Sequence, residues 1–298
     1  HHISQHKKLA SDLYHQKKYL ADEQKRKEAI DFFEKNDFPT RRTEEWRHTD
    51  ISPLLSHDYK KAEIQSIDKK TVSKYKLPEL EAHVLVFVNG HFNRELSGFD
   101  SQSIKTGNIS ALRDKKCFSD CFDKTGITED NVFIAMNTAF SQDGYFIEIQ
   151  KNASLEKPVH IINLLQGNEK PAIALQRNLI IGRNGSRANV IETYHSIENE
   201  TVVFDNVVTE IFTESNAKLN FNLYQAINRQ SYLLHHTKVC QRRDSKFSSH
   251  TYTFSGKIVR NNLNVYFSNE NCEANLYGLY LVDKEQHFDN FTYINHAK

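Results

Sequence analysis

Residues 219–224 read Leu-Asn-Phe-Asn-Leu-Tyr, and residues 262–267 read Asn-Leu-Asn-Val-Tyr-Phe. In both stretches apolar side chains alternate with polar or aromatic ones, which predicts β-strands with one buried face. Such stretches recur through residues 186–297. One set, with openings 27 to 31 residues apart, starts near Ser186, Ala217, Ser245 and Cys272. A second set lies between them at similar intervals and starts near Val202, Ser231, Lys257 and Gln286. This spacing predicts a unit of two short strands that repeats along the chain.

Two architectures fit such a repeat. One is a right-handed parallel β-helix, in which each unit is a coil about 4.8 Å above the last. The other is an antiparallel sandwich of hairpins. Several of the turns are longer than hairpins favour, and the half-units resemble each other, so the pattern favours the β-helix. A stack of coils buries a narrow aliphatic core under polar faces, which agrees with a mean hydropathy of -0.65.

The residues ahead of the repeat predict a helical region. Apolar residues at helical spacing within 9–36 indicate an amphipathic helix that is broken near Asp22. Pro39 ends this helix, and Trp46, the only tryptophan, is expected to act as a packing anchor. The polar, Lys-rich residues 60–76 predict a linker or a mobile loop.

The first sheet-like pattern comes at residues 83–92. Residues 84–88 are continuously apolar, which predicts a strand buried on both faces, and the Asn89-Gly90 pair that follows suits a tight type I′ turn. Residues 101–128 look loop-like and contain Cys117 and Cys121. A single C-x3-C pair is a weak metal signal, and packing or chance explains it better.

Residues 131–140 predict a short helix with Asn131 as its cap. Alternation begins at Tyr145, where the coils are expected to start. The predicted domains are an N-terminal helical region with a linker, 1–80, and a β-helix core, 81–298, made of a lead-in at 81–144 and repeated coils at 145–298.

The composition limits the choice of partners and compartment. Lys and Arg number 39 and Asp and Glu 38, so no net charge favours nucleic acid or an acidic membrane surface. No apolar run reaches the length of about 18 residues that a membrane span needs, and no signal-peptide pattern is present. Four scattered cysteines do not suit a disulfide framework. These features predict a cytoplasmic protein without a nucleic-acid or membrane partner.

Four segments, in this order, together resemble one known family. They are Phe-Pro-Thr-Arg-Arg-Thr-Glu-Glu-Trp-Arg-His-Thr-Asp at 38–50, Val-Phe-Val-Asn-Gly-His-Phe at 86–92, Ala-Met-Asn-Thr-Ala-Phe at 135–140 with Asp-Gly at 143–144, and Gln-His-Phe-Asp-Asn at 286–290 with Ile-Asn-His at 294–296. The set is similar to the SufB/SufD family of the SUF iron-sulfur cluster assembly system. The Phe-Pro-Thr-Arg-Arg segment resembles SufD more than its paralogue SufB.

The resemblance implies a helical N-terminal region, a right-handed β-helix and a scaffold that is not an enzyme. Such a scaffold would pair with SufB, or with a second copy of itself, through the β-helix and would recruit the ATPase SufC. A transient iron-sulfur cluster is expected in the complex and no resident cofactor in the chain. The family's C-terminal helical domain, with the SufC contact, is expected to be absent, because no counterpart precedes Lys298. No catalytic residue is therefore carried over.

Five residues are candidates for an interface or for a place near a cluster: His287, Asp289, His296, Cys272 and Cys240. Iron-sulfur sites need thiolate and occasionally imidazole ligands. The spacing puts His287 and Asp289 on one strand face, and stacking is expected to bring Cys272 near that edge. Hydrogen bonding to turns or to an adjoining subunit is the simpler role for the His and Asp residues. The end at 286–296 is expected to meet a second subunit, because a solenoid leaves an unpaired edge there.

Three further expectations concern single residues. His235 and His236 are expected on an exposed face or turn. Leu279 and Leu281 are expected to be essential to the folding of the last coils. No phosphate-binding loop is present, because Gly256-Lys257 is followed by Ile258.

The competing hypothesis is a polysaccharide lyase or hydrolase built on a β-helix. Such an enzyme needs carboxylates gathered in one groove to act as acid and base. Stacking would have to bring together Asp205, Asp244, Asp283 and Asp289. A structural adaptor without cluster chemistry is a third possibility, and it differs from the scaffold only in its partner.

Overall fold

The computed structural model describes residues 9–100, 102, 104–124, 131–197 and 200–296. It is mainly β and contains two sheets. The first sheet holds β1 (Lys60–Lys61), β4 (Ile104–Asn108), β5 (Tyr145–Ile149), β7 (Ala172–Gly182), β9 (Val203–Thr213), β11 (Tyr232–Gln241), β13 (Ile258–Phe267) and β15 (His287–His296). The second sheet holds β2 (His83–Val88), β3 (His91–Phe92), β6 (Val159–Leu165), β8 (Arg187–Ser196), β10 (Lys218–Ala226), β12 (Lys246–Ser255) and β14 (Glu273–Tyr280).

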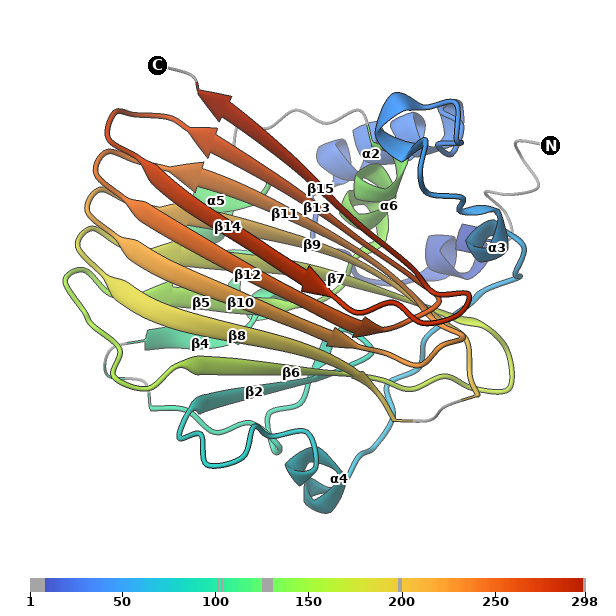
Figure 1. Cartoon of the computed structure of the whole chain (residues 1–298), viewed down its shortest axis with the longest axis horizontal. Helices are drawn as coiled ribbons and strands as arrows, with labels where there is room; N and C mark the ends of the chain where they lie inside the picture. The colour runs from blue at the N-terminus through green and yellow to red at the C-terminus, as the bar shows by residue number, and fades with distance from the viewer. Residues whose placement is uncertain (1–8, 101, 103, 125–130, 198–199, 297–298) are drawn as a thin grey trace.

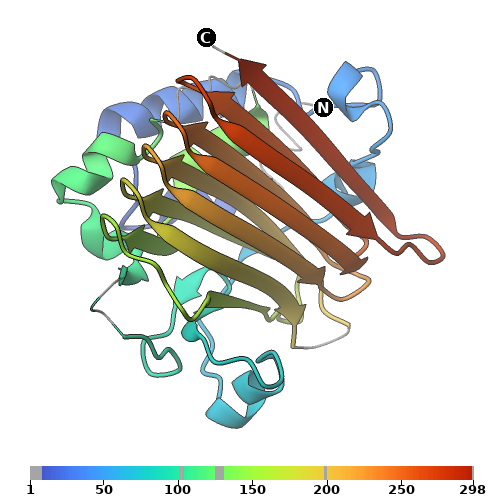
Figure 2. The same cartoon turned by 60° about the vertical axis from the view of Figure 1, so that its left-hand side comes forward.

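The two sheets face each other, and the chain alternates between them in about five turns of a β-solenoid (Figure 1, Figure 2). The first sheet has the order β15-β13-β11-β9-β7-β5-β4, with β1 beside β7, and the second has the order β14-β12-β10-β8-β6-β2-β3. Pairing is parallel except where β4 meets β5 and β3 meets β2. The predicted parallel β-helix is therefore confirmed, and the antiparallel sandwich is wrong.

The register reproduces the sequence repeat. One column of paired positions crosses the first sheet at Ile173, Phe204, Tyr232, Ile258 and His287, at steps of 31, 28, 26 and 29 residues. All eight predicted openings lie one residue before a strand, from β8 to β15. The alternation of side chains located the strands accurately because each one has a buried face and a second, chemically different face.

The turn from the first sheet to the second repeats one backbone conformation in five coils. Its φ angle is positive each time: 60° at Asn152, 70° at Gly185, 62° at Asn216, 59° at Asp244 and 57° at Asn271. Gly, Asn and Asp adopt this left-handed conformation at the lowest cost. The next residue directly precedes the following strand. In three of the coils this residue is buried: Ser186, Ala217 and Ser245.

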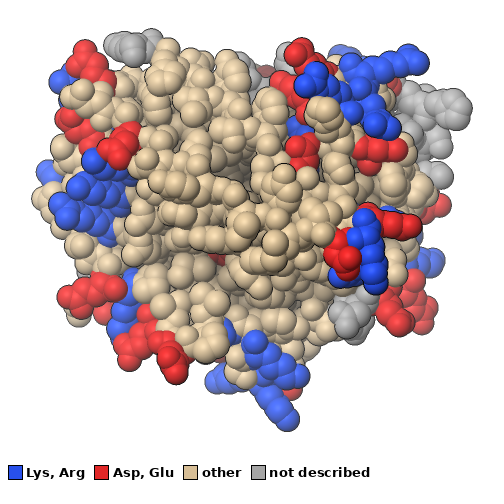
Figure 3. Space-filling view, viewed as in Figure 1, with Lys and Arg blue, Asp and Glu red and all other residues tan. Residues whose placement is uncertain are grey.

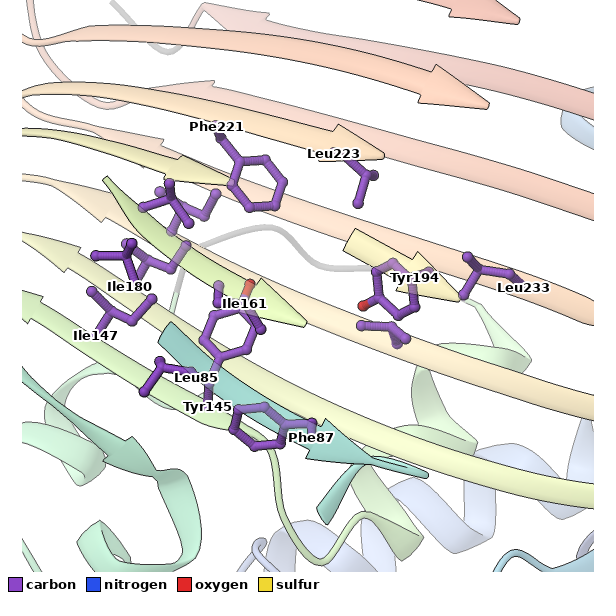
Figure 4. Packing of buried hydrophobic residues seen from close by; sticks show 14 of the residues in the cluster. Leu85, Phe87, Tyr145, Ile147, Ile161, Ile180, Tyr194, Phe221, Leu223 and Leu233 are labelled. Atoms are coloured by element: carbon purple, nitrogen blue, oxygen red, sulfur yellow. The ribbon is translucent and has the colours of Figure 1, made fainter. Parts of the chain in front are cut away.

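The core fills the space between the sheets. Inward-facing side chains of both sheets interdigitate there, among them Ile147, Ile180, Phe221, Leu223 and Leu233 (Figure 4). All five are at most 2% exposed. Burial of side chains of this size contributes about 1.5–3 kcal/mol each to the free energy of unfolding.

Short helices cover the outer face of the first sheet and the flanks of the solenoid (Figure 1). They are η1 (Ser11–His15), α2 (Glu23–Lys35), η2 (Glu44–Trp46), α3 (Ser52–Leu55), α4 (Lys69–Ser73), η3 (Ile109–Leu112), α5 (Lys116–Cys121) and α6 (Val132–Phe140). Among the described residues, none of the helices is long and apolar enough to cross a membrane.

The helical cover begins where the sequence predicts it. The Asp22 side chain caps α2 by accepting a hydrogen bond from the Lys25 backbone N–H at 2.8 Å, so the predicted break near Asp22 is confirmed. Asn131 caps α6 in the same way, with 2.9 Å to the Phe133 N–H. Trp46 is 3% exposed and packs on Phe133, with 5.7 Å between ring centroids, which confirms its anchoring role.

Two segments differ from the prediction. Within 60–76, expected to be a linker, the structure has β1, whose Lys60 and Lys61 pair with β7, and the helix α4. Residues 101–128 were expected to be a loop, and their described part contains β4, η3 and α5. These elements are too short for a periodic pattern to show. Backbone pairing of β1 with β7 and of β4 with β5 holds these two short strands in place.

Candidate functional site

The solenoid has an open end at β14 and β15, the last strand of each sheet. In the described part of the chain, no strand pairs with the outer edge of either one. Seven large apolar side chains lie exposed here: Tyr277, Leu279, Tyr280, Leu281, Val282, Tyr293 and Ile294, each between 41% and 59% exposed. Unpaired edge strands with apolar side chains are templates for pairing with another chain. The open end is therefore the candidate binding surface.

The exposure of Leu279 and Leu281 corrects one expectation. They are 49% and 59% exposed, so they do not fill the core that holds the last coils. Leu279 points outward because the inward positions of β14 are the even-numbered ones, Ala274 and Leu276, which pack against the core. Figure 3 shows that charged side chains gather mainly at the margins of the face of the second sheet and leave its centre uncharged.

His287 and Asp289 lie beside the open end and contact the N-terminal region. The hydroxyl of Thr49 lies 3.1 Å from His287 Nε2 and donates a hydrogen bond to Asp289 Oδ2. Both residues are on the outer face of β15, as their odd-numbered spacing predicts. The structure thus brings these two candidates together within the chain, in contact with Thr49, which is fully buried.

Arg260 of β13 completes this arrangement, which we call the N-terminal junction. Its guanidinium donates to Asp289 Oδ2 and, over 2.8 Å, to the backbone carbonyl of Glu45. Its Cζ atom lies 4.0 Å from the centroid of the Trp46 ring, within the range of a cation–π interaction. Burial lowers the pKa of Arg260, and the Asp289 carboxylate opposes that change. The junction fastens residues 45–49 to the last two strands of the first sheet.

The other three candidates lie near the ends of the strands that are opposite to His287. His296 is exposed, and its ring packs edge-on to Phe267 at 4.8 Å. Cys240 is 6% exposed on the outer face of β11, in register with Tyr266 of β13. Cys272 occupies the turn before β14, with its Sγ 3.2 Å from the Asn269 carbonyl oxygen.

The expected proximity of Cys272 to His287 is therefore not found. His287 begins β15 and pairs with the first residue of β13, whereas Cys272 follows the last residue of β13. A strand of ten residues separates the two places, about 30 Å at 3.3 Å per residue. Burial also raises the pKa of both the Cys240 and Cys272 thiols, and protonated thiols are poor metal ligands. Among the described residues, no three His, Cys, Asp or Glu side chains form a group that could hold a metal ion.

The expectation that His235 and His236 are exposed is wrong. Both lie within β11, where His235 is 1% and His236 2% exposed. Both faces of β11 are covered, one by the second sheet and one by the N-terminal region. His235 faces the core, where its Nε2 lies 3.3 Å from Glu192 Oε2. The alternation of Leu233, His235 and Val239 in the sequence could have revealed this inward position.

The carboxylates that a polysaccharide enzyme would need are dispersed. Asp205 is fully buried between the sheets, whereas Asp244 sits in an exposed turn. Asp283 pairs with Arg229 at 3.0 Å, and Asp289 belongs to the N-terminal junction. These four side chains do not line one groove, so the acid and base arrangement of that hypothesis is not formed.

A surface cavity of about 490 Å³ lies beside the N-terminal junction, between the end of α2, the turn that follows and η2. Phe38 and Trp46 contribute apolar walls, and Asp37 and Glu45 contribute carboxylates. Among the described residues, its lining contains no Cys, His, Ser or Lys.

These features define a class of protein: a two-sheet parallel β-solenoid with a helical cover on one face and an open, apolar end. Comparison with known proteins gives the family. Residues 4–161 match the SufBD protein N-terminal region, and residues 164–298 match the SufBD core domain of SUF system FeS cluster assembly. The chain belongs to the SufBD family of the SUF system.

Curated relatives agree with this assignment. An iron-sulfur cluster assembly SufBD family protein of Synechocystis sp. is 28% identical over 91% of this chain and 62% of its own length. The iron-sulfur cluster assembly protein SufD of Escherichia coli is 23% identical over 87% of this chain and 59% of its own length. The chain thus spans about three-fifths of the length of these two relatives.

Proposed function

We propose that this chain is the solenoid part of a scaffold subunit in SUF iron-sulfur cluster assembly, and that it pairs through its open end with a SufB homologue. The observation that carries the proposal is the unpaired edge of β14 and β15 with its seven exposed apolar side chains. The match to the family over nearly the whole chain supports the assembly role. A second solenoid of the same family would offer edges with the same strand spacing, and a second copy of this chain could pair in the same way.

The hydrogen-bond pattern identifies the groups that would make this contact. In β15 the N–H of His287 donates to the Lys257 carbonyl oxygen at 2.9 Å, toward β13. Backbone groups of a parallel strand point alternately to its two sides. The N–H and carbonyl groups of Thr292 and the other even-numbered residues therefore point away from β13, toward the partner.

We also propose that the scaffold has no catalysis of its own. The dispersed carboxylates and the missing phosphate-binding loop support this. ATP hydrolysis would then come from a SufC homologue, whose contact is inferred from the family resemblance and is assigned to no described residue. Any iron-sulfur cluster would be transient cargo of the complex. The free thiols of Cys240 and Cys272 fit a cytoplasmic location.

The test is co-expression of the full-length gene product with the SufB and SufC homologues of the same organism, followed by purification and mass determination. The proposal expects one stable complex that contains this subunit, the SufB homologue and the ATPase. Recovery of this subunit alone, while the other two associate with each other, would contradict it. A homodimer that excludes SufB would retain the open end as an interface but refute the choice of partner.

A further inference from the structure

Two carboxyl groups lie buried inside the solenoid. Glu192 of β8 and Asp205 of β9 are both fully buried between the sheets. By the alternation along the strands, the inward positions of β7 to β13 hold no Lys or Arg. Among the described residues at these inward positions there are thus two acidic groups and no permanent positive charge to balance them.

Glu192 accepts several hydrogen bonds from side chains inside the solenoid. Its Oε1 accepts hydrogen bonds from Tyr194 Oη at 2.8 Å and from Asn163 Nδ2 at 3.2 Å. Its Oε2 accepts one from Tyr145 Oη at 3.2 Å and lies 3.3 Å from His235 Nε2. Each oxygen of Glu192 thus has two polar side chains within reach.

Asp205 has none of this support. Neither of its side-chain oxygens has a hydrogen-bond partner among the described residues. Its neighbours on the inner face of the first sheet are Ala174 and Leu233, with Gln176 and His235 placed diagonally. A charged carboxylate without donors or a counter-ion is very costly in such a place, and the usual outcome is that it stays protonated. Burial, with a further contribution from Glu192, raises the pKa of Asp205 well above its usual value.

We propose that Asp205 is a proton-binding site inside the solenoid: it is held as a neutral carboxylic acid at neutral pH, and loss of its proton loosens the coils from β7 to β11. Tyr145, Tyr194 and Asn163 donate to Glu192, and neither oxygen of Asp205 has a hydrogen-bond partner among the described residues. The other titratable groups that face this space are Tyr145, Tyr194 and His235. The site goes beyond the scaffold role, because it concerns the stability of the solenoid and no partner.

The sign of the pH effect follows from the protonation states. The folded protein keeps a proton that the unfolded chain loses near pH 3.8, the ordinary value for Asp. Asp205 therefore adds stability in full below that pH, and the contribution falls as the pH rises toward the folded-state pKa. Over this range, each pH unit lowers the ratio of folded to unfolded protein up to ten-fold through this one group.

The test compares urea unfolding of the unchanged protein, Asp205→Asn and Asp244→Asn from pH 5 to 9. Asn has the shape of a protonated Asp but does not titrate, so Asp205→Asn should flatten the fall in stability with pH. Asp244→Asn changes an exposed aspartate and should leave the profile unchanged. Coincident profiles for the Asp205 variant and the unchanged protein would overturn the proposal.

A second measurement observes the proton directly. With ¹³C-carboxyl-labelled aspartate in the unchanged protein, one carboxyl resonance should keep the chemical shift of a protonated acid between pH 5 and 8. The Asp205→Asn variant, if it folds, assigns this resonance by removing it. If all aspartate resonances have the shift of an ionised carboxylate at pH 7, the site does not hold a proton and the proposal fails.

Discussion

The hydroxyl group of Thr49 donates a hydrogen bond to the carboxylate of Asp289, which lies 240 residues further along the chain. Through this contact the helical N-terminal region, which covers the first sheet, also reaches the strand at the open end. The same Asp289 carboxylate accepts from Arg260, which is 1% exposed. Any partner that pairs with β15 would therefore meet a strand that the N-terminal region already holds in place.

Replacing Thr49 by Val should destabilise the protein by about 1–3 kcal/mol, because Asp289 loses a hydrogen bond and His287 loses a polar neighbour. Val keeps the shape of Thr, so the loss reports the hydroxyl group. Urea unfolding measures the change, and Thr292→Val, at an exposed position of β15, is the control. Equal stability of the Thr49 variant and the control would show that the N-terminal junction contributes nothing.

The fluorescence of Trp46 reports on the same junction, because Trp46 is the only tryptophan in the chain. Replacing Arg260 by Met removes the guanidinium that stacks on the indole and bonds the Glu45 carbonyl. We expect a loss of about 2 kcal/mol and a shift of the fluorescence maximum to longer wavelength, as residues 45–49 loosen and water reaches the ring. Arg229→Met, at an exposed ion pair, should change neither quantity. An unshifted spectrum for Arg260→Met would refute the coupling.

Asn216 tests the repeated turn between the sheets. Its φ of 62° is costly for a residue with an ordinary side chain, so Asn216→Ala should lower the free energy of unfolding by about 1–2 kcal/mol. Asn216→Gly should stay within about 0.5 kcal/mol of the unchanged protein, because Gly adopts this conformation freely. Thermal unfolding of the two variants side by side gives the comparison. If Ala and Gly cost the same, the turn does not depend on its left-handed residue.

The burial of His160 affects how the stability of the protein changes at low pH. Burial, with smaller effects from His195 and Lys76, lowers the pKa of His160 to about 4. The unfolded chain takes up a proton near pH 6.5 that the folded protein excludes, so stability present above that pH falls as the pH drops toward 4. The loss from this group is at most about 1.4 kcal/mol per pH unit. His160→Leu should make the acid side of the stability profile shallower, whereas the exposed His48→Leu should not.

Much of the fold could be predicted from the sequence, because each coil imposes the same physical demand on about 30 residues. The alternation at 219–224 and 262–267 reflects strands with one inward face, and the eight strand starts follow from it. The helix at α6 was predictable for a similar reason, since Asn131 is a cap followed by a short apolar segment. Local chemistry determines these elements.

The predictions that failed concern features that depend on how distant segments pack together. His235 and His236 look like surface residues, but they are buried because β11 lies between the second sheet and the N-terminal region. The separation of Cys272 from His287 depends on which end of a strand carries each turn. The contact of Thr49 with Asp289 joins residues 240 positions apart, and no local pattern of either segment encodes it. The roles of the five candidate residues at an interface or near a cluster remain predictions.

The most direct test of the scaffold proposal is the mass of the complex formed with the SufB homologue by Thr292→Pro and Thr292→Ala. Proline removes a backbone N–H that points to the open edge, while Ala keeps it, and neither change disturbs the hydrogen bonds to β13. The account predicts that Thr292→Ala assembles with the SufB homologue and that Thr292→Pro stays folded, with an unchanged circular dichroism spectrum, but does not assemble. A folded Thr292→Pro variant that forms the complete complex would contradict pairing through β15.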